Sequence, residues 1–496
     1  MLRASLAVLL ALAALSPSAE APVHRAGELT FEPYPFRTYD GAMHRAELGR
    51  LWVRQDREAA SDRLIQIAFV IFRSPAQKPR SPVVFLSGGP GMPGIAIGRV
   101  PVYHRLFERL LAASDVILLD QRGIGMSSPN TACPEGPAPP AAVFETEAGF
   151  QDALTALAHA CADYWRGEGL DLAAFTTAAS ADDVEDLRAA LQSDRISLLA
   201  HSYGTAVALA TVRRHGERLD RVVLAGSEGP DQTLHMPLVF DFALRRLSGM
   251  AAAAPGLSGA FPDTYGEFQR VLDKIEKEPL SVPIQTGTKQ QITLRVGAFV
   301  LRFAVKNMLS NGRQADRVPA LVYSVAHGDP TLLIPAVQDL YNVLASGFSA
   351  MQFAVSCSDG WSAERRRLAE AQASHSVFGD APFIHLDSRL CGAVGGASPQ
   401  SDSLLPVWSS VPTLLVSGTL DSNTPAFQSE EILWGLSNGQ SLHVENGFHD
   451  TLPSPEVQAI VTAFLGGADV RGRAVELPPP VFLTIEKAKT LAFAEH

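Results

Sequence analysis

The chain has 496 residues, a formal net charge of −11, and 46% hydrophobic against 19% charged residues. Domains usually contain about 100 to 200 residues, so this length allows one large core or two smaller ones, and the composition excludes wholesale disorder. We expect no nucleic-acid partner, because proteins that bind nucleic acids carry clustered Lys and Arg. The basic run Arg365–Arg367 lies in a helical pattern, where it indicates a solvated face.

The first 21 residues have the pattern of an export signal. Arg3 supplies a positive charge, Ala4–Leu15 is apolar, and Ser16–Ala21 offers small residues for cleavage. The apolar stretch is shorter than the roughly 20 residues that a membrane-spanning helix needs. We therefore expect a signal peptide over residues 1–21, an exported protein in the periplasm or outside the cell, and no membrane span in the mature protein.

Strand-like apolar runs recur along the first half of the chain and again near its end, and several are followed by glycine-rich loops. Continuous apolar runs of this kind are typical of a parallel sheet that is buried on both faces, with functional loops at the carboxyl ends of its strands. A helix is expected from about Ser180, with Asp183 completing a capping pair. The predicted strands are Leu29–Phe31, Ala46–Val53, Leu64–Phe72, Pro82–Leu86, Val116–Leu119, Ile196–Ala200, Arg221–Gly226, Pro412–Gly418 and Ser441–Val444.

The strand pattern fades between residues 229 and 405, where helical patterns dominate. A helical insertion between two strands of one sheet is best explained as a cap over the site. We therefore predict an α/β fold with a mostly parallel central sheet, helices on both faces and an inserted helical cap. In this division residues 22–228 and 406–496 form the two parts of the core, and 229–405 form the cap.

Four cysteines occur in the chain, at positions 133, 161, 357 and 391. In an exported protein an even count favours disulfides over metal ligands or catalytic thiols. Sequential pairing, Cys133 with Cys161 and Cys357 with Cys391, is the simplest of three possible connectivities. No Cys-x-x-Cys or His-x-x-x-His spacing suggests zinc, so no metal site is predicted.

Ser202 stands in a small-x-Ser-x-Gly turn that joins an apolar strand to helix-forming residues, the sequence shape of a nucleophile elbow. A serine hydroxyl needs a base within hydrogen-bond reach and a third group to orient that base. Asp421 and His449 follow in the order Ser, acid, His, each on a loop after a predicted strand. We therefore predict Ser202 as nucleophile, His449 as base and Asp421 as the orienting acid.

The competing candidates are weaker. His201 adjoins the nucleophile and is expected to serve packing or hydrogen bonding. His443 lies within a strand, and Asp450 is too near His449 in sequence to orient its ring. For the oxyanion hole, the N–H of Tyr203 directly follows the nucleophile, and Gly88 or Gly89 would supply a second donor where the backbone can approach a substrate.

Together these motifs carry a resemblance to a known family. Gly88-Gly89-Pro90-Gly91, the Asp-Gln-Arg-Gly turn at 120–123, the Ser202 elbow, Gly418-Thr419-Leu420-Asp421 and the late His449 resemble the proline iminopeptidase and tripeptidyl aminopeptidase branch of the α/β-hydrolases. The segment Cys357-Ser358-Asp359 is also similar to one in the secreted tripeptidyl aminopeptidases. Three features depart from the family pattern: Ser87 stands where His is usual, Ala200 replaces the first glycine of the elbow, and Gly-Ala-Val follows Cys391 where a Trp is often seen.

The resemblance implies a serine exopeptidase that removes residues from the N-termini of short peptides without metal or organic cofactor. Glu228, in the loop after the strand Arg221–Gly226, is a candidate to bind the substrate's N-terminal amine. Two alternatives remain: a carboxylic ester hydrolase using the same triad, and a non-catalytic peptide-binding protein with this fold. The oligomeric state is left open by the sequence.

Overall fold

The computed structural model describes residues 24–59, 63–257, 259–346, 349–383, 388–393 and 402–492. The predicted signal peptide over residues 1–21 lies outside these ranges. Within them, no helix is long and apolar enough to cross a membrane.

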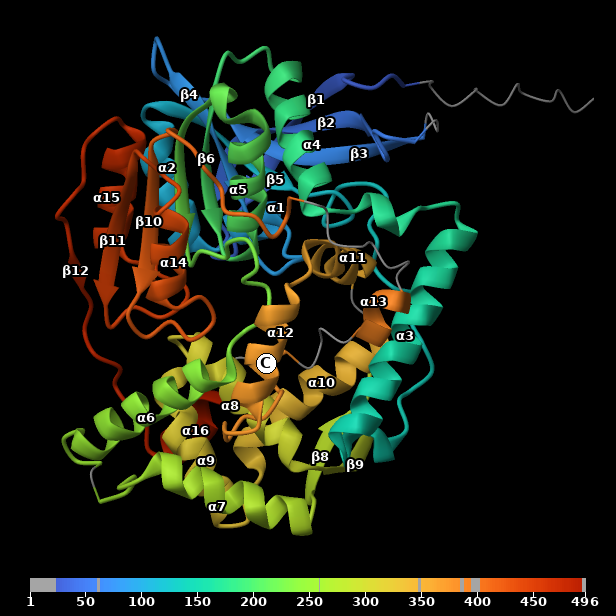
Figure 1. Cartoon of the computed structure of the whole chain (residues 1–496), viewed down its shortest axis with the longest axis vertical. Helices are drawn as coiled ribbons and strands as arrows, with labels where there is room; N and C mark the ends of the chain where they lie inside the picture. Colours follow the sequence, from blue (N-terminus) through green and yellow to red (C-terminus); the bar gives the residue numbers. More distant parts are fainter. Residues whose placement is uncertain are drawn as a thin grey trace, which may run out of the picture.

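A ten-stranded sheet forms the upper layer of the molecule in Figure 1, with strand order β1-β2-β3-β5-β4-β6-β7-β10-β11-β12. The first three strands run antiparallel, and β3 also pairs antiparallel with β5. From β5 to β12 every neighbouring pair is parallel. The strands are β1 (Leu29–Arg37), β2 (Met43–Arg54), β3 (Leu64–Phe72), β4 (Arg80–Leu86), β5 (Ser114–Asp120), β6 (Ile196–His201), β7 (Leu219–Ala225), β10 (Thr413–Gly418), β11 (Gly439–Glu445) and β12 (Val475–Glu476).

The central strands are apolar because helices cover both of their faces. Along β4, Val84 and Leu86 pack in one core with α4 (Thr177–Ala190) and α5 (Tyr203–His215). Their neighbours Val83 and Phe85 pack in another core with α2 (Pro101–Leu111) and α15 (Pro455–Leu465). Successive side chains of a strand point to opposite faces, so one apolar run feeds both cores. The predicted fold class, an α/β fold with a mostly parallel sheet, is confirmed.

Helix α4 begins at Thr177, and the prediction of a start near Ser180 is wrong. The side chain of Thr176 accepts a hydrogen bond from the N–H of Ala179 at 3.0 Å and so caps the helix. Thr is a good N-cap residue, and it satisfies a donor that the first turn leaves free.

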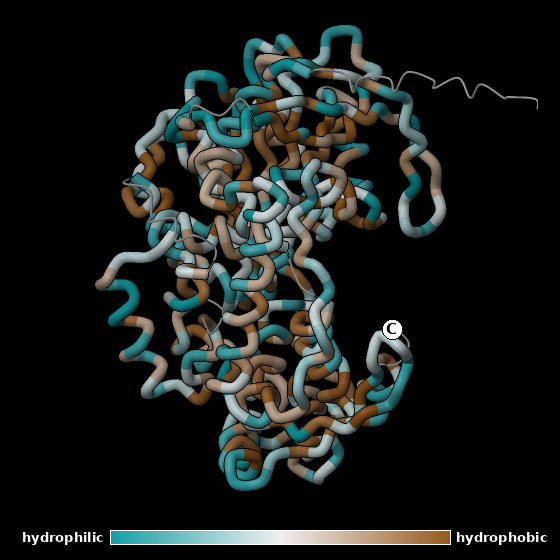
Figure 2. Tube along the Cα trace, turned by 90° about the vertical axis from the view of Figure 1, so that its right-hand side faces the viewer, coloured by the Kyte–Doolittle hydropathy of each residue, from teal (hydrophilic) through white to brown (hydrophobic). Residues whose placement is uncertain are grey.

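The segment between β7 and β10 forms a second lobe with a hydrophobic core of its own, drawn below the sheet in Figure 1. Besides helices it contains a two-stranded antiparallel hairpin of β8 (Leu280–Gln285) and β9 (Gln291–Val296), which the helical prediction did not include. Figure 2 shows hydrophobic stretches inside both the sheet layer and this lobe. The lobe's helices are α6 (Pro237–Ala253), α7 (Thr264–Lys277), α8 (Ala298–Ser310), α9 (Val318–Ala326), α10 (Ile334–Ser346), α11 (Ala350–Asp359), α12 (Ala363–Ala373) and α13 (Ser388–Ala393).

Two helices from outside residues 229–405 also pack into the lobe. Helix α3 (Glu147–Gly167) contributes Phe150 and Leu154 to the lobe's core, and α16 (Ile485–Ala492) contributes Ala488. Conversely, Ala350 and Met351 of α11 pack in the core between the sheet and α4 and α5, so packing crosses the division at residues 228 and 405 in both directions.

Two disulfides are present, Cys133–Cys161 and Cys357–Cys391, which is the sequential pairing. The first joins the loop after β5 to α3. The second joins α11 to α13 inside the lobe.

Candidate active site

Ser202 lies between the end of β6 and the start of α5, with φ of 54° and ψ of −132°. A non-glycine residue at positive φ costs about 1 to 3 kcal/mol, a strain found mainly at functional sites. Gly204 makes the turn possible, because a Cβ there would lie 2.2 Å from the carbonyl oxygen of Leu86. Ala200 is fully buried and pairs with β4 and β7, so a methyl group is tolerated at the first position of the elbow.

The side chains of Ser202, His449 and Asp421 form a chain of short contacts. Ser202 Oγ lies 2.9 Å from His449 Nε2, and His449 Nδ1 lies 3.0 Å from Asp421 Oδ2. With the ring proton on Nδ1, His449 donates to Asp421 and can accept the serine proton at Nε2. The three residues that the sequence singled out are therefore within hydrogen-bond reach of one another.

Backbone and side-chain donors hold the Asp421 carboxylate in place. The N–H groups of Asn423 and Thr424 donate to Oδ1 at 2.8 and 3.0 Å, and the Thr424 hydroxyl donates to Oδ2 at 2.6 Å. Burial alone would raise the pKa of Asp421, but the His449 charge and these hydrogen bonds hold it below its ordinary value. The group is thus an anion at neutral pH.

The pKa of His449 is shifted in the opposite direction from that of Asp421. Burial lowers its pKa, but the nearby charge and hydrogen bond of Asp421 outweigh burial, and the pKa lies above its ordinary value. A raised pKa stabilises the imidazolium that forms when the ring takes a proton.

The loop after β4 approaches Ser202 closely. A Cβ on Gly88 would lie 2.7 Å from the Cβ of Ser202, so only glycine fits at that position. Gly89 has φ of 119°, which also favours glycine. Tyr203 is the first residue of α5, so its N–H has no partner within the helix and is available to an oxyanion. Gly88, Gly89 and Tyr203 thus lie around Ser202.

Residues 81–261 match the family described as alpha/beta hydrolase fold. The chain has the α/β-hydrolase fold. A similar curated protein is a probable proline iminopeptidase of Leptolyngbya boryana, 25% identical over 199 residues that make up 40% of this chain and 43% of that protein. Serine protease Hip1 of Mycobacterium tuberculosis is 28% identical over 193 residues, 37% of this chain and 36% of that protein.

The matched segments thus span less than half the length of these curated relatives. Among solved structures, the proline iminopeptidase of Mycobacterium smegmatis aligns with 81% of this chain and 95% of its own, at 15% identity and a TM-score of 0.37. A thermophilic esterase from Thermogutta terrifontis aligns with 84% of this chain and 98% of its own, at 17% identity and a TM-score of 0.39. The sequence matches confirm the resemblance to the iminopeptidase branch of the α/β-hydrolases.

Two carboxyl groups of this hydrolase fold lie beside the Ser202 elbow. Glu228 follows β7, and its charge acts on the pKa of both His449 and Tyr203. Burial, with the Asp359 charge adding to it, raises the pKa of Glu228 to about 8. Burial likewise raises the pKa of Asp359, at the end of α11, to about 7.

Both carboxyl groups line one pocket, together with small and aliphatic residues such as Ala206 and Leu209. Thr177 connects Asp359 to the elbow, since its hydroxyl donates to Asp359 at 2.8 Å and lies 3.0 Å from the hydroxyl of Tyr203. The sequence singled out Glu228 but did not assign a role to Asp359, whose place beside the site depends on how the lobe folds back.

A second group of side chains, which sequence reasoning did not connect, contacts the backbone of His449. His201 Nε2 lies 3.4 Å from the His449 carbonyl oxygen and 3.9 Å from Asp450 Oδ1. The hydroxyl of Tyr103, on α2, donates to the same Asp450 oxygen at 2.7 Å. These contacts tie the loop that carries His449 to a helix more than 300 residues earlier in the chain.

Arg122 of the Asp-Gln-Arg-Gly turn lies outside this group and is fully buried. It forms a two-point ion pair with Asp183 and donates to the carbonyl oxygens of Gln55 and Ala174. Its planar fork of donors thus joins three segments of the core, a structural role.

Proposed function

We propose that this chain is an exported serine hydrolase, an aminopeptidase that cleaves near the N-terminus of short peptides through an acyl-enzyme on Ser202. The observation that carries the proposal is the continuous contact from Ser202 Oγ through His449 to the Asp421 carboxylate. Peptidase-named relatives and two disulfides support it further.

In the proposed reaction, Ser202 Oγ attacks the scissile carbonyl carbon while His449 Nε2 accepts the hydroxyl proton. The carbonyl oxygen becomes an oxyanion that the N–H of Tyr203 and a backbone donor at Gly88 or Gly89 stabilise. His449 then gives the proton to the leaving amine, and the C–N bond breaks. Water, deprotonated by the same ring, releases the acyl group as a carboxylate and restores Ser202.

Amine recognition separates an aminopeptidase from a general hydrolase. A substrate ammonium group carries one positive charge, and Glu228 and Asp359 are two of the four carboxyl groups that line the pocket, with Asp231 and Asp402. Arg213 and Arg214 line it as well. The positive charge of an ammonium ion bound there would lower the raised pKa values of Glu228 and Asp359. The carboxyl groups would then ionise and carry the negative charge that binds the ammonium ion. We assign Glu228 to this role, with Asp359 as its neighbour across the pocket.

Replacing the nucleophile tests the reaction. We expect Ser202→Ala to reduce kcat on peptides by a factor on the order of 10⁶ while the fold is retained. It should also abolish labelling by a fluorophosphonate probe. Ser374→Ala, at an exposed serine that ends α12, is the matched control and should behave as the wild type. Retained activity in Ser202→Ala would refute the nucleophile assignment.

Substrate choice tests the aminopeptidase proposal separately. Aminoacyl and tripeptidyl arylamides with a free amine should be cleaved, and N-acetylated versions of the same compounds should not. Simple acyl esters form the third set of substrates in this comparison. Cleavage of the esters alone would favour the carboxylic ester hydrolase, and failure of the wild type to react with the fluorophosphonate probe would favour the non-catalytic peptide-binding protein.

Export rests on the signal-like pattern over residues 1–21 and on the two disulfides, which form mainly in oxidising compartments. Cell fractionation of the full-length protein, with mass spectrometry of its new N-terminus, tests this part. A cytoplasmic protein that keeps residues 1–21 would contradict it.

A further inference from the structure

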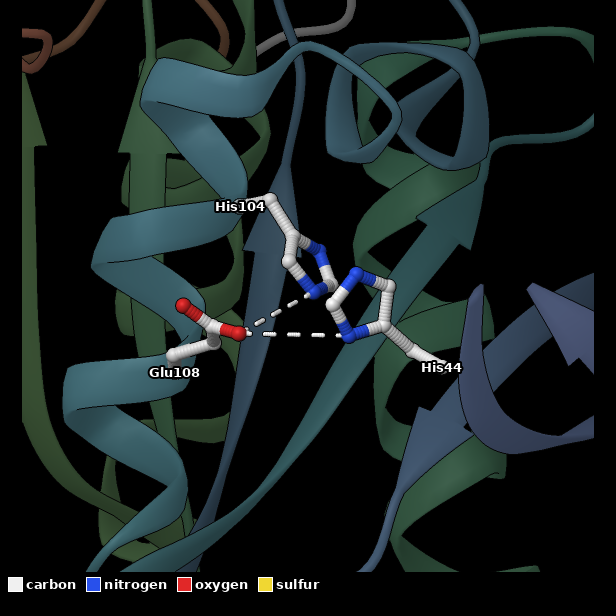
Figure 3. Close-up of side chains that lie close together, drawn as sticks. All are labelled: His44, His104 and Glu108. Atoms are coloured by element: carbon white, nitrogen blue, oxygen red, sulfur yellow. Dashed lines mark ion pairs between the residues drawn. The ribbon is translucent and has the colours of Figure 1, made fainter. Parts of the chain in front are cut away.

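His44, His104 and Glu108 form a cluster that plays no part in the proposed reaction. His44 lies on β2, whereas His104 and Glu108 lie four residues apart on α2, on the same face of that helix. Figure 3 shows the three side chains converging from the strand and the helix. The rings of His44 and His104 are 3.9 Å apart between centroids, at an interplanar angle of 49°.

The three groups converge without bonding to one another. Glu108 Oε1 lies 3.8 Å from His44 Nδ1 and 3.8 Å from His104 Nε2, and both distances are too long for a hydrogen bond. One atom from each residue lies within 4.8 Å of the other two. Donor atoms bound at about 2.0 to 2.1 Å around a tetrahedral ion are roughly 3.3 Å apart. The two distances to Glu108 are about 0.5 Å longer than this, and the two histidine nitrogens, which lie within 4.8 Å of each other, need to approach by at most about 1.5 Å.

Packing holds one ligand rigidly and leaves the others accessible. His104 is 5% exposed, and its ring stacks on Phe36 at 5.7 Å and meets the edge of Phe72 at 5.5 Å. The side chains of His44 and Glu108 are 24% and 52% exposed. They line a surface pocket, which gives an ion an entry path and a water molecule room to bind as the fourth ligand.

We propose that His44, His104 and Glu108 bind a divalent transition-metal ion of the zinc class. Two imidazole nitrogens and one carboxylate oxygen suit Zn²⁺, Co²⁺ or Ni²⁺. They do not suit Ca²⁺ or Mg²⁺, which require six or more oxygen ligands. His44 Nε2 is buried and has no hydrogen-bond partner in the described part of the chain, so no neighbouring group orients this ligand. Such partners usually raise metal affinity by about 10- to 100-fold, so we expect weaker binding than at a site whose ligands are all supported.

The ion would fasten β2 to α2, one residue from Tyr103, whose hydroxyl holds Asp450 beside His449. The site is therefore a structural cross-link on the helix that supports the loop of His449. The cluster has no His-x-x-x-His spacing, the pattern on whose absence the sequence prediction of no metal site depended: the helix supplies His-x-x-x-Glu, and the third ligand lies 60 residues earlier in the chain.

Titration of the mature, untagged protein tests the proposal, because a polyhistidine tag would itself bind the ion. After treatment with a chelator and its removal, Zn²⁺ is titrated by calorimetry, and Co²⁺ by its visible absorption. We expect one ion per chain and a rise in Tm with Zn²⁺. His44→Gln and Glu108→Gln should each weaken binding at least tenfold, and both positions are exposed enough for the variants to fold.

His443→Gln, at an exposed histidine on β11, is the matched control and should leave the affinity unchanged. Absence of stoichiometric binding by the wild type would overturn the proposal. Equal affinity in the wild type and in the His44 and Glu108 variants would also overturn it, because the ion would then bind elsewhere, for example at His449.

Discussion

Glu228 should reduce the stability of this protein at alkaline pH, and Glu228→Gln should restore it. A carboxyl group whose pKa rises on folding keeps a proton that the unfolded chain releases. Its contribution is therefore favourable below the unfolded value of 4.5 and is lost as pH rises toward the folded value of about 8. Gln has nearly the same shape and cannot ionise, so the variant escapes this loss.

The magnitude follows from the two pKa values. A rise from 4.5 to about 8 corresponds to about 5 kcal/mol of unfolding free energy at pH 8.5. Because Glu228 is partly exposed, water screens its charge and the effect will be smaller. We expect Glu228→Gln to be about 2 kcal/mol more stable than the wild type at pH 8.5, and nearly equal to it at pH 5.

Urea unfolding at pH 5 and pH 8.5 measures this difference, with Glu430→Gln as the control at an exposed glutamate on α14 (Ala426–Leu433). The same variant should lose kcat/KM on free-amine substrates but not on acyl esters, since only the former need the carboxylate. A variant no more stable than the wild type at pH 8.5 would refute the claim that burial raises the pKa of Glu228.

Two further substitutions probe the proposed reaction. Asp421→Asn should lower kcat about 10⁴-fold with the fold intact, because Asn cannot fix the His449 tautomer, and a loss below tenfold in steady-state assays would contradict this role. Gly88→Ala should lower both activity and fluorophosphonate labelling at least 100-fold, because the added methyl group would lie 2.7 Å from the Cβ of Ser202. Gly249→Ala, where a Cβ would meet nothing within 4 Å, is its control, and equal labelling of the two variants would refute the crowding argument.

The sheet and the residues around Ser202 could be predicted because their signals are local. Strand β10 is buried along its whole length, and burial on both faces leaves an unbroken apolar run that periodicity detects. Ser202 and Asp421 each follow such a strand, whereas His449 follows β11, which alternates between buried and more exposed residues; strand order then brings the three loops together. The order of the three residues along the chain was enough to predict that they lie together. The structure adds the contact distances, 2.9 Å from Ser202 Oγ to His449 Nε2 and 3.0 Å from His449 Nδ1 to Asp421 Oδ2.

Other features depend on contacts between distant segments, and no local pattern encodes them. The hairpin of β8 and β9 has alternating apolar residues, but each strand is only six residues long and is surrounded by helical patterns. Asp359 and Tyr103 reach the site only because α11 and α2 pack where they do. The apolar residues of α16 do not indicate which surface they will cover, and they cover the inserted lobe.

The inserted lobe contacts both ends of the proposed catalytic apparatus. From α11, the Gln352 amide donates to the Pro90 carbonyl oxygen at 2.7 Å, beside the loop that would supply an oxyanion donor. From α8, the Ser310 hydroxyl donates to Asn423 at 2.9 Å, in the turn that orients Asp421. A substrate that shifts the lobe would thus move both loops at once. In the proposed reaction, binding of the peptide N-terminus between Glu228 and the lobe's Asp359 would therefore affect kcat as well as KM.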